Sequence, residues 1–200
     1  MNAKRRNFYC LFLIIISSFS VRGQVVINEY SAANLSQFAD NNTKYEDWVE
    51  LYNTSGSAVS IGGYYLSDDS TNNTKYQIPV GTTMAGNGFM RFWASGRNMS
   101  VGTHFHTNFK LTQTKSNKED LVLSNPAGTI IDGLRLTVTQ LGHSFGRSTN
   151  GAATWKIFTI PTPNSSNNSA ISYTDYAARP DATLAAGFYS GTQLVTLTTT

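Results

Sequence analysis

The sequence predicts an all-β protein, and three observations support that prediction. Beyond the first 23 residues, no segment of ten or more residues keeps the 3.6-residue period of an amphipathic helix. Several short segments instead alternate apolar and polar residues, as half-buried β-strands do. Asn, Ser, Thr and Gly are abundant and only 14% of the residues are charged, which is typical of an extracellular β-protein with many turns.

The first two strands are expected at residues 25–30 and 48–52. Residues 25–30 are apolar on both sides of the strand, which predicts a central position in a sheet. In the second segment Trp48, Glu50 and Tyr52 alternate with two aliphatic residues. That period of two predicts a strand with two different faces.

The next strands are expected at residues 58–61 and 64–67, which Gly62-Gly63 separates as a bend or hairpin. Residues 75–78 form another strand, and Pro79 limits it to a sheet edge or ends it. After a turn at 84–88, the apolar segment 89–94 is the strongest strand candidate.

Five further predictions complete the set. A turn with Pro at its second position, Asn125-Pro126-Ala127-Gly128, separates two strands and predicts a hairpin. The expected strands are a short one within 105–111, then 120–124, 129–132, 142–146 and 155–158.

Residues 1–23 have the pattern of a signal peptide. Lys4, Arg5 and Arg6 precede an apolar stretch from Phe8 to Ile16 that is short for a bilayer span, and a cut is expected before Gln24. A retained membrane anchor is the alternative. Cys10 precedes the apolar stretch, so it is not placed as a lipid-modified cysteine. The sequence predicts bacterial export and a secreted or cell-surface location, with no membrane span after cleavage.

Removal of the signal peptide changes the charge of the chain. Four of the 15 basic residues leave with it, so 11 remain against 12 acidic ones and the net charge changes from +3 to −1. Such a chain lacks the basic surface that neutralises phosphates, so no nucleic-acid partner is expected. Cys10 is the one cysteine of the chain, so the mature protein folds without disulfides and depends on its core.

Seven pieces of the chain follow one another in a distinctive order. They are Ile27-Asn28-Glu29, residues 47–53, residues 63–69, residues 106–111, residues 119–126, residues 144–147 with Trp155, and Pro161-Thr162-Pro163-Asn164. In this order they resemble the bacterial secreted form of the lamin tail domain. The resemblance implies an immunoglobulin-like β-sandwich at residues 25–164 that binds or positions and does not catalyse. Tyr64 stands where the family often has Trp, and Asn164 where it often has Gly.

After residue 164 the composition changes. Residues 165–178 begin with a polar, low-complexity run and are expected to form a flexible linker. Residues 179–200 resemble the start of a chitobiase/β-hexosaminidase C-terminal-type module, a second small β-sandwich. Because strands without partners do not fold alone, we expect the chain to be the N-terminal piece of a longer protein or a truncated gene model. Other domains of that polypeptide are then its expected partners.

Acidic residues concentrate around the second strand. Oxygen ligands of this kind suit Ca²⁺, although the Gly and the terminal Glu of an EF-hand loop are missing. The alternative is that Asp47 caps a turn and the other carboxylates face solvent or pair with Lys44 and Lys75. The candidate calcium ligands are Glu29, Asp40, Glu46, Asp47 and Glu50.

Other residues have the chemistry of a reactive or metal site but not its full pattern. His104 and His106 would project from one face of a strand at metal-ligand spacing, but a third ligand is not evident. Asp68-Asp69 is typical of turn chemistry. The chain has no nucleophile elbow, no metalloprotease helix motif and no phosphate-binding loop. The sequence therefore predicts no enzyme in these 200 residues and no catalytic residue.

Aromatic residues allow two interpretations. A sandwich without disulfides needs them in its interior, and Trp48 and Trp93 are the expected buried pair. A surface platform that stacks sugars would use Tyr64, Tyr65 and Trp93. The sequence therefore predicts a non-catalytic module that anchors or presents a larger extracellular protein, and the alternative is a targeting module that binds an extracellular polysaccharide, a cell-surface protein or calcium.

Overall fold

The computed structural model describes residues 23–116 and 119–199. Within these ranges every regular element is a β-strand, apart from one turn of 3-10 helix at Asn167–Ser169. The predicted all-β class is confirmed. The predicted signal peptide lies, except for Gly23, outside the described residues. The described ranges hold no helix with the length and apolarity that a bilayer crossing needs.

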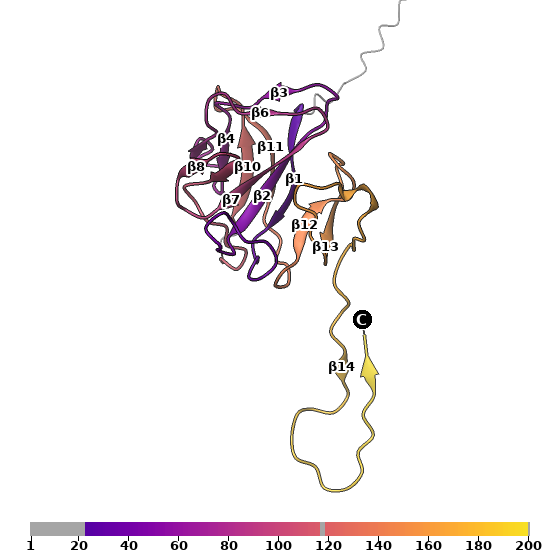
Figure 1. Ribbon diagram of the computed structural model, residues 1–200. Coiled ribbons are helices and arrows are strands. Elements are labelled where there is room, and N and C mark those ends of the chain that lie inside the picture. The colour runs from indigo at the N-terminus through magenta and orange to yellow at the C-terminus, as the bar shows by residue number, and fades with distance from the viewer. Residues whose placement is uncertain (1–22, 117–118, 200) are drawn as a thin grey trace, which may run out of the picture.

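Two sheets pack face to face as an immunoglobulin-like sandwich (Figure 1). Neighbouring strands are antiparallel except β7 and β9, which are parallel. The larger sheet contains, in spatial order, β13 (Trp155–Phe158), β12 (Ser144–Arg147), β1 (Val25–Ser31), β2 (Asp47–Asn53), β7 (Phe89–Ala94), β9 (His104–His106) and β8 (Met99–Val101). The smaller sheet contains β11 (Ile130–Arg135), β10 (Asp120–Ser124), β4 (Tyr65–Ser67) and β5 (Tyr76–Gln77).

The interior between the two sheets is apolar and closely filled. Alternate residues of β2 and β7 face it, so Val49, Leu51 and Phe92 are fully buried there. The smaller sheet contributes Leu66 and Leu121 from the opposite side. Burial of side chains of this size stabilises a fold by about 1.5–3 kcal/mol each, so the core can hold the sandwich together without disulfides.

Most strand predictions are confirmed within one or two residues. The predicted hairpin at 125–128 joins β10 and β11, and Gly128 adopts a positive φ of 77° there. The segment around Gly62-Gly63 differs from a hairpin. It is a bend, because β3 (Val59–Ser60) pairs with β6 (Thr83–Met84) while β4 belongs to the smaller sheet.

An irregularity in β1 is stabilised by side chains from other strands. The register between β1 and β2 shifts between Ile27 and Glu29, which marks a bulge at Asn28. The Ile27 N–H donates to Asp132 Oδ2 at 2.7 Å, and Arg147 Nε donates to the Ile27 carbonyl at 2.6 Å. The Arg147–Asp132 ion pair, at 2.8 Å, joins these two side chains. Side chains thus satisfy the backbone groups of Ile27 beside the bulge.

Residues 159–176, which we call the closing segment, fold back onto the larger sheet. Asn167 is fully buried, and Tyr173 exchanges two backbone hydrogen bonds with Ile157 of β13, at 2.8 and 2.9 Å. Tyr176 accepts a hydrogen bond from the Gln140 N–H and its ring stacks on His143. The segment expected as a flexible linker at 165–178 is therefore attached to the sandwich at Asn167, Tyr173 and Tyr176, although most of its residues are exposed.

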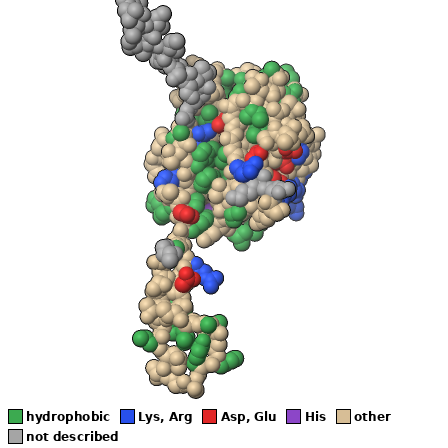
Figure 2. All heavy atoms as spheres, turned by 180° about the vertical axis from the view of Figure 1, so that it is seen from behind, with side chains coloured by type: hydrophobic (Ala, Val, Ile, Leu, Met, Phe, Trp, Pro, Cys, Tyr) green, Lys and Arg blue, Asp and Glu red, His purple; other side chains and the backbone are tan. Residues whose placement is uncertain are grey.

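Beyond the closing segment the chain extends away from the sandwich as a two-stranded ribbon of β14 (Asp181–Ala182) and β15 (Leu197–Thr198) (Figure 1). Hydrophobic side chains gather on this ribbon (Figure 2), and Phe188, Leu194 and Leu197 are exposed. The ribbon has no packed interior of its own.

Candidate functional site

The candidate site residues lie mainly on the outer face of the larger sheet, the face turned away from the core. Residues of β2 and β7 that do not face the core project there, and the register places Trp48 opposite Trp93 and Glu50 opposite Arg91. The bulge in β1 brings Glu29 opposite Glu50. The loop 34–46 and the closing segment cover parts of this face.

The five predicted calcium ligands do not meet. Glu29 and Glu50 form one group beneath the closing segment, whereas Asp40, Glu46 and Asp47 belong to a second group around the loop 34–46. Among the described residues no three carboxylate, histidine or cysteine side chains are grouped so that they could hold a metal ion. The expectation of a single acidic cluster is wrong, because Glu29 and Glu50 lie beneath the closing segment, whereas Asp40 and Glu46 of the loop 34–46 bind Arg97.

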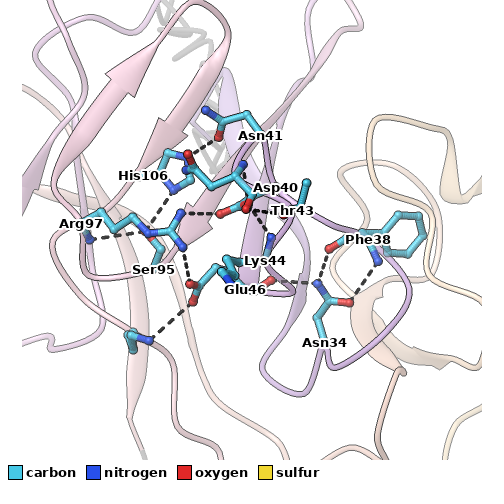
Figure 3. Close-up of polar contacts among 12 residues, drawn as sticks. Asn34, Phe38, Asp40, Asn41, Thr43, Lys44, Glu46, Ser95, Arg97 and His106 are labelled. Atoms are coloured by element: carbon cyan, nitrogen blue, oxygen red, sulfur yellow. Dashed lines mark hydrogen bonds and ion pairs between the residues drawn. The ribbon is translucent and has the colours of Figure 1, made fainter.

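The second group is a network centred on Arg97 (Figure 3). The guanidinium donates to Asp40 Oδ2 at 2.5 Å and to Glu46 Oε1 at 2.8 Å. Asp40 also accepts from the backbone N–H groups of Asn42 and Lys44. Although burial opposes it, these hydrogen bonds and Arg97 lower the pKa of Asp40. Arg97 therefore ties the loop 34–46 to the end of β7.

His106 extends this network into the sheet (Figure 3). Its Nε2 lies 2.7 Å from Asn41 Oδ1, which can only accept, so Nε2 carries the proton. Its Nδ1, at 3.0 Å, then accepts from the Ser95 hydroxyl. Burial lowers the pKa of His106, so the ring is neutral at pH 7. Both nitrogens are thus used in structural hydrogen bonds, and His104, on the same face, is half-buried without joining them.

Asp47 has a structural role close to the one expected. Its Oδ1 accepts from the Asn34 N–H at 3.1 Å, and Asn34 in turn donates to the carbonyls of Phe38 and Glu46. Burial raises the pKa of Asp47 to about 6. The sequence alternative, a turn-capping Asp47, agrees with this geometry. Lys75 pairs with Asp68 at 2.6 Å, and not with a member of the acidic set.

Glu29 and Glu50 are fully buried, and the prediction that they face solvent or pair with lysines is wrong. Glu29 accepts from the Ser144 hydroxyl at 2.5 Å and from the Thr162 N–H at 2.9 Å. Glu50 accepts from Asn28 Nδ2 at 3.1 Å and from the Asn164 N–H at 2.5 Å. The backbone of the closing segment thus binds both carboxyl groups.

The environment of this pair favours the uncharged acids. Burial, and to a lesser extent the neighbouring Glu29, raises the pKa of Glu50 to about 8. Burial also raises the pKa of Glu29. Gly146 makes room for the pair, because a Cβ there would meet Glu29 Cγ and Phe158 Cε2 at 3.0 Å. Two such carboxyls resemble an acid–base dyad, but the closing segment covers them and no path leads a substrate to their oxygens.

The aromatic residues proposed for sugar stacking are separated. Trp93 is only 1% exposed, lies on the larger sheet, and is covered by Arg91, whose guanidinium carbon is 4.1 Å from the ring centroid. Tyr64 packs against the core, and the Tyr65 hydroxyl accepts from Gln77 Nε2. A shared platform of these three residues is not formed, because they belong to different sheets. Trp48 and Trp93 are buried as expected, but they lie on the outer face of the larger sheet and not in the interior between the two sheets, where they were expected.

Sequence reasoning missed three arginines that organise this face, Arg91, Arg97 and Arg147. Periodicity places them on strands or turns but does not reveal their partners, of which Glu46 lies 51 residues from Arg97 and Ile27 lies 120 residues from Arg147. For Arg91 a signal was available, since it is the one charged residue of the strand Phe89–Ala94.

Comparison with known proteins agrees with this architecture. The family model for the lamin tail domain matches residues 18–138. No curated protein matches the chain significantly.

Proposed function

The chain belongs to the lamin tail domain family, an immunoglobulin-like family that is typically non-catalytic, and we propose that it is an exported module that positions a second region of its parent polypeptide. The observation that supports the proposal is the closing segment. It is bound to the sandwich by the Glu29–Glu50 pair, by Tyr173 and by Tyr176. The chain therefore leaves the sandwich at a defined point near Ala177.

The ribbon beyond that point is the region to be positioned. An isolated two-stranded ribbon is marginal in water, and exposed apolar side chains mark a surface that packs on something else. Phe188 and Leu194 are exposed on it. We propose that residues 179–200 begin a second β-sandwich module of the chitobiase/β-hexosaminidase C-terminal type, and that further strands of the same polypeptide cover these side chains.

Distance measurements between spin labels test the positioning role. Cys10 is the single cysteine, so a Cys10→Ser background accepts two labels at chosen sites. The test pair is Ser57→Cys with Ala177→Cys, and the reference pair is Ser57→Cys with Thr149→Cys. All three sites are exposed. If the module positions the region beyond it, the distances measured for the test pair should be distributed as narrowly as those for the reference pair. A broad distribution for the test pair alone would refute the proposal.

Export is tested separately, by expressing the chain with its own leader in a bacterial host. We propose cleavage before Gln24, since the basic, apolar and small-residue regions of residues 1–23 follow the pattern of a signal peptide. N-terminal sequencing of the product outside the cytoplasm is then expected to begin at Gln24. A product that stays in the cytoplasm and begins at Met1 would contradict export.

A further inference from the structure

Arg91 differs from the other arginines of the sandwich in having no carboxylate partner. Arg97, Arg135 and Arg147 each form an ion pair with an acidic side chain. For the guanidinium of Arg91, the described residues provide neither a hydrogen bond nor an ion pair, only the Trp93 ring at 4.1 Å. The side chain is half-buried and borders an unfilled space, so its charge is partly desolvated.

That space is a cavity of about 220 Å³ on the outer face of the larger sheet. It lies between β7, residues 103–105 and the closing segment. Four of its eight lining residues are apolar, and Thr103, His104 and Asn164 are polar members besides Arg91. The apolar lining residues are Phe89, Met90, Trp93 and Phe105.

The parallel register of β7 and β9 places a second nitrogen group near the arginine. Phe92 is opposite Phe105 and Trp93 is opposite His106, so Arg91 lies beside His104. Both side chains project from the outer face, since Phe92 and Phe105 face the core. The cavity is therefore lined by the guanidinium of Arg91, the imidazole of His104 and several aromatic side chains.

The nearest acid leaves the charge of Arg91 available. Glu50 is opposite Arg91 on β2, but its oxygens already accept from Asn28 and Asn164. Burial and Glu29 raise its pKa to about 8, although Arg91 opposes the shift, so at pH 7 the neutral acid is favoured. A ligand anion can therefore supply the counter-charge that the protein does not.

We propose that this cavity binds a carboxylate-bearing ligand, with the fork of Arg91 holding both carboxylate oxygens and the apolar walls covering the carbon skeleton. A guanidinium matches a planar carboxylate through two parallel hydrogen bonds. A carboxylate carries one charge, which one arginine compensates, whereas a doubly charged phosphate would keep one charge uncompensated in a partly apolar cavity. Sugar acids have a carboxylate on a partly apolar ring and fit this combination.

Titrations followed by NMR of the Arg91 Nε–H and Trp93 indole N–H signals test the site. The probes are acetate, glucuronate, a glucuronate polymer, inorganic phosphate and, as the uncharged control, glucose. We expect saturable shifts with the carboxylates, and at least tenfold weaker binding of phosphate and glucose. Tighter binding of glucuronate than acetate assigns the ligand to sugar acids. Tighter binding of the polymer than of free glucuronate identifies a polysaccharide as its source, and the reverse identifies a free metabolite.

Variants make the test specific to Arg91. Arg91→Gln should abolish the shifts at Trp93, and Arg91→Lys, which keeps the charge but loses the fork, should weaken binding at least tenfold. Arg135→Gln removes an exposed arginine of the smaller sheet and should leave binding unchanged. The site is refuted if neither carboxylate gives a saturable shift, if Arg91→Gln binds as the natural chain does, or if phosphate binds as tightly as the carboxylates. The spin-label distances do not depend on any of these outcomes.

Discussion

Buried carboxyl groups that lie side by side couple the stability of this fold to pH. The folded state raises the pKa of Glu50 to about 8, above the value of 4.5 expected when the chain is unfolded. Between these values the folded state binds more protons than the unfolded state, so its stability is highest at low pH and falls as the pH rises from about 4.5 to about 8. The full shift corresponds to a few kcal/mol, on the order of 1.4 kcal/mol per pKa unit.

We predict that Glu50→Gln removes this loss. Gln cannot ionise, but its NH2 group faces the Asn28 or Asn164 donor, which lowers stability by an amount independent of pH. Relative to the natural chain, the variant should therefore gain a few kcal/mol as the pH rises from 5 to 8.5. Urea unfolding at several pH values measures the difference. Parallel pH profiles for the two proteins would show that Glu50 does not titrate as described.

Arg97 provides a second prediction at the scale of single residues. Arg97→Met leaves the side chain of Asp40, which is 0% exposed, without its charged partner. The expected loss is about 1–3 kcal/mol in the free energy of unfolding. Arg135→Met is the matched control, because the side chain of Arg135 is 65% exposed in its pair with Asp120 and should lose less than about 1 kcal/mol. Equal losses in the two variants would contradict a structural role for the Arg97 network.

Individual residues show what the sequence could and could not reveal. Asn164 has a φ of +59°, a left-handed conformation that Gly and Asn tolerate better than other residues. The acidic residues stand out in the sequence, but their division into two groups does not. The bulge at Asn28 pairs Glu29 with Glu50, and the fold of the loop 34–46 brings Asp40 and Glu46 to Arg97. No period in the sequence signals either feature.

At the scale of elements, the strands were predictable because alternation records which face is buried. The segments 89–94, 120–124 and 155–158 appear with the predicted bounds. Short strands such as β8 and β6 were missed, since two or three residues carry too little pattern. The polar composition of the closing segment predicts a linker instead of a packed segment. Its order comes from buried hydrogen bonds to distant residues, which composition does not reveal.

Asn167 holds the closing segment in place, and its removal should loosen the segment as a whole. Its amide donates to the Arg147 carbonyl at 2.8 Å, and its Oδ1 lies 2.9 Å from the Thr162 hydroxyl. We predict that Asn167→Ala costs about 1–3 kcal/mol of stability and speeds hydrogen exchange at the Tyr173 amide. Ser165→Ala, at an exposed neighbouring site, should change neither quantity. Unchanged exchange in Asn167→Ala would mean that the segment is held by other contacts.

At the scale of the whole molecule, a sandwich without disulfides binds the closing segment. The closing segment in turn fixes the point at which the ribbon leaves the sandwich. The core between the sheets supplies stability, and the outer face of the larger sheet binds the closing segment through Glu29, Glu50 and Asn167. These two roles lie on opposite faces of one sheet. The arrangement explains why buried polar groups are concentrated on the outer face, where they specify a single position for the closing segment.

Heteronuclear ¹⁵N–¹H NOE values along residues 155–199 measure the central claim most directly. If the closing segment is part of the sandwich, residues 165–176 should have values equal to those of β12 and β13, with a fall only after Ala177. A fall that begins at Ser165 would mean that the segment is a flexible tether, and the sandwich would then have no means of positioning the ribbon at residues 179–199.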